Sequence, residues 1–178
     1  KPYNEQEEKD KILILDWIRN NENAFSRENA VAHMTASAWV VNRERTKVLM
    51  VYHNIYNSWS WLGGHADGET DLLAVALREV KEETDADASI IKYVGKSQYT
   101  FNTQEDTVVK DVHWYLMMGE SYHSKPQREE FFVDSGFYKY HEAVHLLKFS
   151  NEKQILEKAY SEYLDLKKSN LWGNRKYF

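Results

Sequence analysis

The sequence predicts one domain that mixes β-strands with α-helices. Segments rich in β-branched and aromatic residues alternate with segments whose apolar residues recur at helical spacing, which is typical of an α/β or α+β domain. The length of 178 residues fits one ordinary domain with a substantial core. There is no internal repeat, low-complexity tract or linker rich in glycine, serine and proline, so we expect residues 1–178 to fold together.

The first third of the chain predicts one helix and two strands. Apolar residues near the N-terminus recur at roughly helical spacing and indicate an amphipathic helix with an apolar stripe of Ile12, Leu15 and Ile18. Residues 33–41 alternate apolar and polar side chains and therefore predict a strand. A polar turn and an apolar run at 47–53 follow, so we expect a second strand that forms a hairpin with the first.

The rest of the chain predicts a central helix, further strands and a terminal helix. Good helix formers run from residue 71 to residue 84. Residues 88–101 and 107–120 are rich in β-branched and aromatic residues and predict two strands. A long polar loop is expected at 121–136, then a short strand and the start of a helix at 136–147. The last helix, at 151–168, has an apolar stripe of Ile155, Leu156, Ala159, Tyr163 and Leu166.

Composition excludes several classes of protein. The formal net charge is −5 with no long basic run, which argues against binding to duplex nucleic acid. Because there is no cysteine, disulfides, thiolate zinc sites and a cysteine nucleophile are excluded. No apolar segment approaches the ~18 residues of a membrane span. The chain also begins without the pattern of a signal peptide, so we expect a cytoplasmic protein that does not bind membranes.

The helix at 71–84 carries three carboxylates on one side. At ~100° per residue, Glu79, Glu82 and Glu83 share a sector of roughly 100°, with Arg78 at its edge. This sector borders the apolar face, whereas Lys81 points away from it. An acidic face that only served solubility would lie opposite the apolar face. The alternative is that these acids hold a divalent cation, because hard cations prefer carboxylate oxygens.

The loop before this helix supplies a complementary feature. Its sequence, GGHADGE at 63–69, opens with two glycines that allow backbone to approach a ligand closely. It leads into a helix N-terminus, which is suited to an anion such as phosphate. A loop and a helix of this kind can therefore combine an anion site with a metal site.

These residues resemble the signature of the Nudix hydrolase family, written G-x5-E-x7-R-E-U-x-E-E-x-G-U, where U is a bulky aliphatic residue. The matching positions in this chain are Gly64, Thr70, Arg78, Glu79, Val80, Glu82, Glu83, Asp85 and Ala86. Three positions depart from the pattern. Thr70 stands in place of the first glutamate, with Glu69 one position early, Asp85 replaces a glycine in a left-handed position, and Ala86 is a small final residue.

The resemblance implies a Nudix-like α/β/α sandwich with a mixed β-sheet, plus N- and C-terminal helices. Its core would span about 33–150, with a helical extension at 1–30 and a C-terminal helix and tail at 151–178. The apolar stripes of the terminal helices fit packing within the chain equally well as packing across a homodimer. Members of the family cleave a diphosphate linkage in a nucleoside diphosphate joined to another group, using Mg²⁺ or Mn²⁺.

Carried over residue by residue, the resemblance gives roles to the acidic sector. Gly64, through its carbonyl, Glu79, Glu82 and Glu83 would hold the metal. Glu82, Glu83 and Arg78 would be catalytic, with Arg78 orienting the acids through charge-assisted hydrogen bonds. The general base is either one of these glutamates or an acid of a later loop. The later candidates are Glu129, Glu130, Asp134 and Glu142, each of which is otherwise a solvated acid or a helix cap.

Four further residues are candidates for substrate binding. His65 and Asp67, in the glycine loop, could contact phosphate or metal-bound water, and Tyr99 and Tyr138 could stack on a base. Each tyrosine has an ordinary alternative role in core packing. Two functions follow from the resemblance: a metal-dependent hydrolase of a nucleotide-type small molecule, and a non-catalytic Nudix domain that senses such a ligand. Retention of all three helical glutamates favours the hydrolase.

Overall fold

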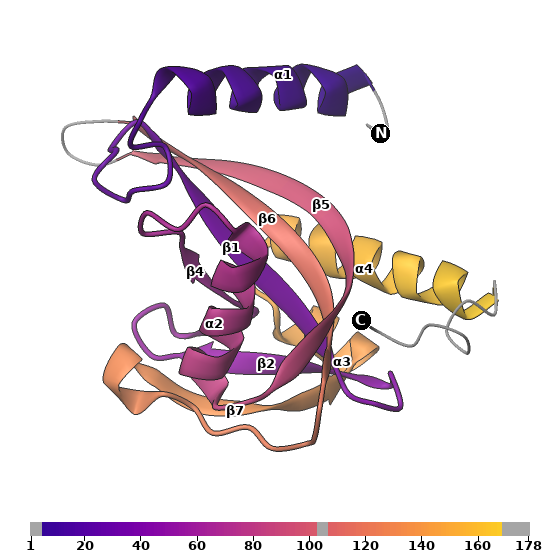
Figure 1. Cartoon of the computed structure of the whole chain (residues 1–178). Helices are drawn as coiled ribbons and strands as arrows, with labels where there is room; N and C mark the ends of the chain where they lie inside the picture. Colours follow the sequence, from indigo (N-terminus) through magenta and orange to yellow (C-terminus); the bar gives the residue numbers. More distant parts are fainter. Residues whose placement is uncertain (1–4, 103–106, 169–178) are drawn as a thin grey trace.

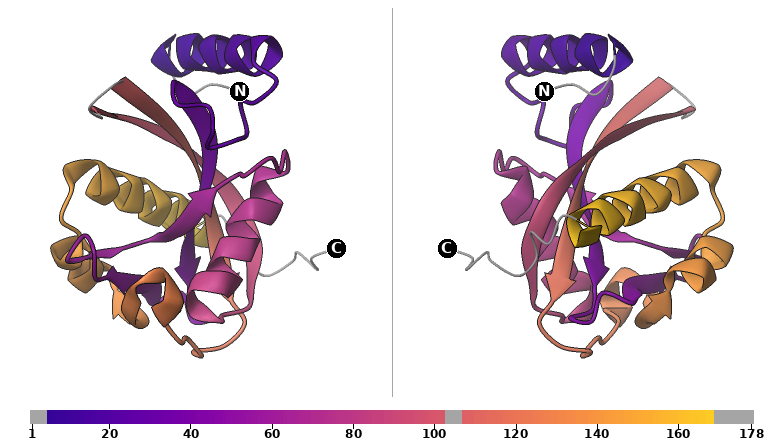
Figure 2. Two further views of the ribbon diagram at one scale, coloured as in Figure 1. Left: turned by 90° about the vertical axis from the view of Figure 1, so that its left-hand side faces the viewer. Right: turned by 90° about the vertical axis from the view of Figure 1, so that its right-hand side faces the viewer.

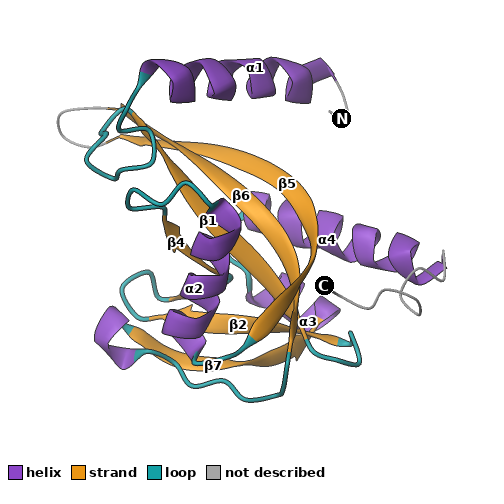
Figure 3. Ribbon diagram, in the orientation of Figure 1, coloured by secondary structure: helices purple, strands orange, loops and turns teal. Residues whose placement is uncertain are grey.

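A computed structural model describes residues 5–102 and 107–168 of the chain. Four helices and seven strands lie in these ranges (Figures 1 and 3). The helices are α1 (Glu5–Asn20), α2 (Leu72–Thr84), α3 (Tyr140–Leu146) and α4 (Ser150–Lys168), with a 3-10 turn, η1, at Arg128–Glu130. The strands are β1 (Ala32–Val41), β2 (Lys47–His53), β3 (Ser58–Ser60), β4 (Leu62–His65), β5 (Ala88–Asn102), β6 (Thr107–Gly119) and β7 (Phe132–Lys139).

All seven strands belong to one mixed sheet. The main order is β3-β2-β1-β6-β5, with β4 paired to β1 and β7 paired to β2. The β1–β6 pair is parallel over its whole length, while the other pairs are antiparallel. Strand β1 therefore lies at the centre, with β6 along one side and β4 along the other. This confirms the mixed sheet that the family resemblance implied.

The central position of β1 appears in its burial and in its pairing. The strand predicted at 33–41 is confirmed as β1, and every residue from His33 to Val41 is buried, because both faces of β1 are covered. The expected hairpin with β2 is present but short: the two strands pair at Val41 and Val48, beside their connecting turn. Beyond that turn β2 pairs with β7 and β3 instead. A polar turn between two strands does not by itself reveal which partners the rest of each strand takes.

Each face of the sheet has its own core (Figure 2). On one face, α2 buries Val75, Ala76 and Val80 against alternate residues of β1 and β2. On the opposite face, α4 buries Ile155, Leu156 and Ala159 against the remaining residues of the same strands. The sandwich of helix, sheet and helix follows from this division. The predicted stripe of α4 is confirmed by these three buried residues.

Helix α1 lies across the end of the sheet near the start of β1 (Figure 3). It contributes Ile14, Trp17 and Ile18 to the core on the α2 face. Of the predicted stripe, Ile18 is confirmed, whereas Ile12 and Leu15 are exposed. The true stripe has the i, i+3, i+4 spacing that one helical face requires. None of the helices within the described ranges is long and apolar enough to cross a membrane.

Some strands extend beyond those that the sequence predicted. Strand β3 lies in a segment to which the sequence analysis assigned no element, and β4 brings the two glycines of the predicted loop beside β1. Strand β7 begins at Phe132, inside the predicted polar loop at 121–136. Its pairing with β2 over most of its length explains the difference, because partner backbone stabilises a strand whose own sequence alternates poorly.

Candidate active site

The candidate site is built on β4, the turn at 66–70 and α2. Helix α2 begins after Asp71, whose carboxylate accepts hydrogen bonds from the backbone N–H groups of Leu73 and Ala74. Glu69, the acid that lies one position early relative to the family pattern, accepts the N–H of Asp71 at 2.8 Å. The displaced glutamate therefore stabilises the turn before the helix. Asp85 ends the helix in the left-handed conformation that the sequence predicted, with φ of 53°.

Two glycines of β4 allow the acidic helix to approach the sheet closely. A Cβ atom at Gly64 would lie 2.4 Å from a carboxylate oxygen of Glu79. A Cβ atom at Gly63 would lie 2.3 Å from the hydroxyl of Ser37 and 2.6 Å from the carbonyl oxygen of Ala36. Gly63 therefore requires glycine because of the neighbouring strand, whereas a side chain at Gly64 would displace the carboxylate of Glu79.

Glu83 is the most deeply buried of the three helical acids. Its side chain is only 4% exposed, and its carboxylate accepts the backbone N–H of Gly63 at 3.0 Å. Glu79 and Glu83 therefore meet the same pair of glycines from α2. The helical wheel placed these acids at the border of the apolar face, and this arrangement explains why they lie there. A solvated acidic face would leave both carboxylates in water.

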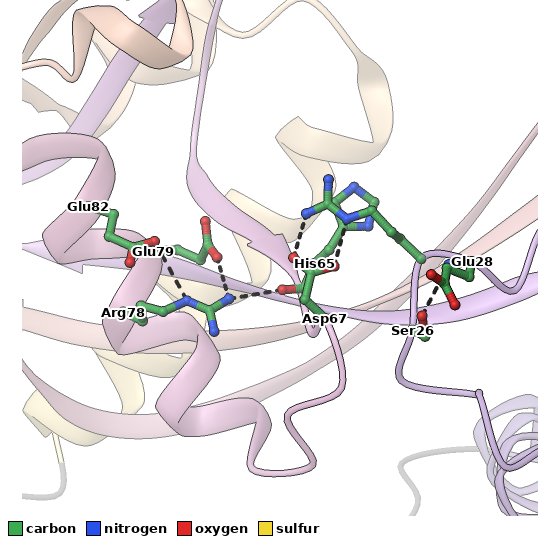
Figure 4. A network of polar contacts seen from close by, with 8 residues as sticks. Ser26, Glu28, His65, Asp67, Arg78, Glu79 and Glu82 are labelled. Carbon is green, nitrogen blue, oxygen red and sulfur yellow. Dashed lines mark hydrogen bonds and ion pairs between the residues drawn. The ribbon is translucent and has the colours of Figure 1, made fainter.

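Arg78 links the acids to the glycine loop (Figure 4). Its guanidinium donates to the carbonyl oxygen of His65 at 3.0 Å and to the carboxylate of Glu79 at 2.8 Å. It also lies 3.6 Å from a carboxylate oxygen of Glu82, which is about half exposed. The hydrogen bond to Glu79 is the main cause of the raised pKa of Arg78. Arg78 therefore contacts two acids and one backbone carbonyl at once.

His65 and Asp67 lie in the same loop but contact different groups. The ring of His65 packs against the ring of His33, with centroids 4.9 Å apart. The carboxylate of Asp67 accepts two hydrogen bonds from Arg27, one of them at 2.6 Å from Nε. These bonds are the main cause of the lowered pKa of Asp67. The negative charge of Asp67 is thus matched by a cation from the segment before β1.

The remaining candidates are more dispersed. Tyr138 lies on the face of the sheet opposite α2, where its ring meets Trp59 edge-on at 4.9 Å. Asp134 is exposed on β7, and its carboxylate accepts the N–H of Ser135. Glu142 caps α3 by accepting the N–H of Lys139 at 2.8 Å. The backbones of Tyr99 and Glu130 are in β5 and η1, while their side chains lie outside the described part of the structure.

The segment before η1 is fastened to the end of α2. The N–H of Lys125 donates to the carbonyl oxygen of Thr84 at 2.7 Å, and the N–H of Gln127 donates to that of Glu83 at 2.9 Å. Both bonds use carbonyls that the last turn of a helix leaves without an intrahelical partner. This contact brings the backbone just before η1 to the C-terminal end of the acidic helix. Asp134, further along the chain, faces solvent from β7.

Tryptophans form a wall on the sheet beside the glycines. Trp61 precedes β4 and donates from its indole N–H to the hydroxyl of Ser37 at 3.1 Å. Its ring meets that of Trp114 edge-on at 4.6 Å, and Trp114 stacks on Trp39 at 6.0 Å. The sequence analysis did not connect these residues. The sequence shows three tryptophans, but it does not reveal that their side chains share one face of the sheet.

The donors fit a hard divalent cation of the magnesium type. Among the described residues no three His, Asp or Glu side chains gather into a metal-binding group. Glu79 and Glu83, however, both reach the two glycines, and Gly64 adds a backbone carbonyl there. Mg²⁺ is usually held by one or two carboxylates and completes its shell with water and substrate phosphates. Two carboxylates beside one backbone carbonyl meet that requirement.

Sequence reasoning missed Arg27 entirely. It lies in the connection between the first predicted helix and strand, 40 residues before Asp67, and no pattern links the two positions. The contact depends on how α1 and the following turn dock on the sheet. Only the folded arrangement could have identified this residue.

A family model, described as the NUDIX domain, matches residues 31–159 of the chain. Three solved structures illustrate the similarity of fold. A C. elegans Ap4A hydrolase in a binary complex has a TM-score of 0.58 at 14% identity, covering 76% of this chain and 98% of that one. The E. coli dihydroneopterin triphosphate pyrophosphohydrolase has a TM-score of 0.57 at 13% identity, covering 70% and 92%. The NUDIX domain of Shewanella oneidensis NrtR, complexed with ADP ribose, has a TM-score of 0.58 at 18% identity, covering 84% and 97%.

Proposed function

The chain belongs to the NUDIX domain family, and on that premise we propose that it hydrolyses a diphosphate linkage in a nucleoside diphosphate joined to another group, with Mg²⁺ or Mn²⁺. One observation carries the proposal: Glu79 and Glu83 converge on Gly63 and Gly64 at the start of the loop that leads into α2. Two like charges one helical turn apart repel each other, and a bound divalent cation would reverse that repulsion because hard cations prefer carboxylate oxygens. The protein is accordingly an enzyme acting on acid anhydrides in phosphorus-containing substrates.

The metal would be held by Glu79, Glu83 and the carbonyl of Gly64, with Glu82 as a further ligand directly or through water. When bound, such a cation neutralises charge on the phosphates and lowers the pKa of attacking water. Arg78 keeps the carboxylate of Glu79 and the carbonyl of His65 in fixed positions. This orientation before substrate arrives is what a site of this kind requires.

The general base is proposed from the acids near α2. Glu82 is about half exposed and lies one turn from Glu79 on the same side of the helix. Glu130 follows the segment that is fastened to the end of α2. Asp134 is the weaker candidate because it is exposed on β7 and its carboxylate accepts the N–H of the neighbouring Ser135. Separate Glu82→Gln, Glu130→Gln and Asp134→Asn variants assign the role.

The substrate is proposed to be of the nucleotide type. The names of the similar structures include Ap4A, a pterin triphosphate and ADP ribose, which all join an aromatic ring to phosphates. In this chain, Trp61 and His65 are the rings nearest in sequence to the two glycines. An aromatic ring beside a phosphate site offers a stacking surface for a base. His65 and Trp61 are therefore proposed to contact the substrate.

The test is release of nucleotide or phosphate in the presence of Mg²⁺ or Mn²⁺ from a panel of diphosphate compounds. The panel contains nucleoside triphosphates, ADP-ribose, NADH, nucleotide sugars and diadenosine polyphosphates. Glu83→Gln is the active-site variant, and Glu162→Gln on α4 is the matched control on the opposite face of the sheet. Metal-dependent cleavage that is lost in the first variant and kept in the second supports the proposal.

A different pattern would favour a sensing domain. A sensor would show no cleavage of any panel member, while one of them raises the melting temperature of the wild-type chain. The complex of the NrtR NUDIX domain with ADP ribose makes that compound the first ligand to examine in this way. The hydrolase proposal would then be wrong for this chain, although the nucleotide-type ligand would stand.

A further inference from the structure

Arg27 fastens the glycine loop to a part of the chain that precedes the region matched by the family model, which begins at residue 31. Its guanidinium makes two hydrogen bonds to the carboxylate of Asp67, from Nε and from Nη2. A planar guanidinium that meets a carboxylate through two parallel bonds fixes both position and orientation. A single ammonium group at this position would not impose the same geometry.

The backbone around Arg27 makes the contact firm. The carbonyl oxygen of Phe25 accepts the N–H of Gly68 at 2.9 Å, next to Asp67 in the loop. The carbonyl oxygen of Ala24 accepts the N–H of Met34 in β1 at 3.0 Å, and Ala24 itself is fully buried. The segment at 24–27 is thus hydrogen-bonded to the central strand β1 through Ala24, and to the glycine loop through Phe25 and Arg27.

The loop needs such support because of its backbone conformation. Asp67 and Gly68 are successive residues with positive φ, at 49° and 91°. An aspartate in the left-handed region is less stable than in the ordinary regions, so other contacts must hold it there. Arg78 holds the loop from α2 through the carbonyl of His65, and Arg27 holds it from the opposite direction.

We propose that Arg27 is a positioning residue for the active site and acts through Asp67, an inference that rests on the hydrolase function proposed above. By holding Asp67, it keeps the loop where Gly64 meets Glu79 and where the carbonyl of His65 meets Arg78. It also matches the negative charge of Asp67, which would otherwise repel an approaching phosphate. Asp67 then serves the loop and is not itself a ligand of substrate or metal.

The proposal separates catalysis from stability. Both side chains of the pair are substantially exposed, at 58% for Arg27 and 40% for Asp67. Exposed ion pairs contribute little to the stability of a fold, so Arg27→Ala should fold like the wild type. Loss of position in the loop should nevertheless reduce the rate, because a site tolerates little displacement of its groups.

The kinetic test uses the full chain and a double-mutant cycle. Arg27→Ala and Asp67→Asn should each lower kcat/KM by roughly 10-fold, the scale of losing a group that orients a ligand. If Arg27 acts through Asp67, the double variant should lose no more than either single variant. Arg27→Lys should recover part of the rate. Arg19→Ala, which breaks an exposed pair with Asp16 on α1, is the matched control and should retain the wild-type rate.

A second measurement does not depend on activity. Hydrogen exchange of the backbone amides of Gly68 and Glu69 should be faster in Arg27→Ala than in wild type, and unchanged in Arg19→Ala. Equal exchange in all three proteins would overturn the proposal. It would also be overturned if the losses from Arg27→Ala and Asp67→Asn multiplied, since Arg27 would then act on the substrate directly. If the wild-type chain cleaves no compound, the proposed function fails, while the exchange rates still decide whether Arg27 fixes the loop.

Discussion

Glu83 and Glu152 are both buried glutamates, on helices that pack against opposite faces of one sheet, but their carboxylates have different partners. Glu83, near the end of α2, accepts the N–H of Gly63 in strand β4. Glu152, in the first turn of α4, accepts the N–H of Phe149 at 3.3 Å, just before its own helix. One carboxylate is directed at another element of the fold, and the other at the start of the helix that carries it.

The difference separates Glu83, whose carboxylate belongs to the candidate site, from Glu152, whose carboxylate stabilises the start of its own helix. Burial raises the pKa of Glu152 to about 7, although hydrogen bonds from the backbone of Phe149 and Lys148 oppose this shift. A helix start commonly has an acid of this kind, so Glu152 needs no ligand to explain it. Helix α2 is capped by Asp71, and Glu83 lies at its other end. Glu83 therefore does not cap its own helix, and this agrees with the metal-binding role that we propose for it.

The largest expected effect tests this separation directly. Glu83→Gln should lower kcat by about 10³-fold, the scale of losing one electrostatic stabiliser of a transition state. Glu152→Gln should leave kcat unchanged, because α4 packs on the face away from α2. Turnover measured with Mg²⁺ for both variants provides the comparison. Equal activity of the two variants would remove the distinction between the two glutamates.

The next effect concerns the glycine that faces Glu79. In Gly64→Ala the added Cβ would meet the end of the Glu79 side chain, which can rotate away, so the fold should survive while the carboxylate is displaced. We expect kcat/KM to fall roughly 10–100-fold, as when a group that orients a metal ligand is lost. Activity and melting temperature should be measured together with those of Gly136→Ala.

Gly136→Ala is a suitable control because its added Cβ would meet Tyr138 at an ordinary contact distance of 3.5 Å. It should change neither activity nor melting temperature appreciably. Gly63→Ala would be a poor substitute for Gly64→Ala, since its Cβ would collide with the backbone of Ala36 and disturb the sheet itself. A Gly64→Ala variant with wild-type kcat/KM would mean that the position of Glu79 is unimportant.

The third effect is on stability and concerns Glu152. The folded state holds its proton up to a pH of about 7, whereas the unfolded state releases it near the ordinary value of 4.5. The stabilisation from this group is therefore complete below about 4.5 and is lost as the pH rises through 7. It amounts to at most about 3 kcal/mol. Urea unfolding at pH 5 and pH 8 should show this decline in the wild-type protein.

Glu152→Gln should flatten that part of the pH dependence, because glutamine can accept the same hydrogen bond without a charge. At pH 8 the variant should be more stable than the wild-type chain by a fraction of the same ~3 kcal/mol. The control is Glu142→Gln, an exposed cap on α3. A decline that persists unchanged in Glu152→Gln would assign the pH dependence to other groups.

The sequence predicted the position of Glu83 on α2 better than the burial of Glu152 on α4. The acids of α2 could be placed because helical geometry is local: a turn of ~100° per residue determines which side chains share a face. The same reasoning located the stripe of α4. It did not identify Glu152 as a buried acid, because the burial of that residue depends on the sheet against which its helix packs.

Contacts between distant segments account for the other differences. Arg27 and Asp67 meet because α1 and the turn after it dock on β1, a geometry that no short pattern encodes. The short strand predicted from residue 136 is the second half of β7, but its first half lay in a predicted loop because its partner, β2, is far earlier in the chain. The sequence analysis singled out the two glycines of β4, but only the folded structure shows what lies against them. A carboxylate lies against Gly64, and a neighbouring strand lies against Gly63.

The smallest effect returns to the division of roles on α2. Asp71→Ala removes the carboxylate that accepts the N–H groups of Leu73 and Ala74, so the free energy of unfolding should fall by about 1 kcal/mol. If capping and chemistry are carried by different residues of α2, kcat/KM should fall less in Asp71→Ala than in Gly64→Ala. Chemical denaturation and steady-state turnover of the same preparation measure both quantities. A loss of turnover as large as that of Glu83→Gln would mean that the helix start is itself part of the reacting site, because the stability change alone is too small to empty the folded state.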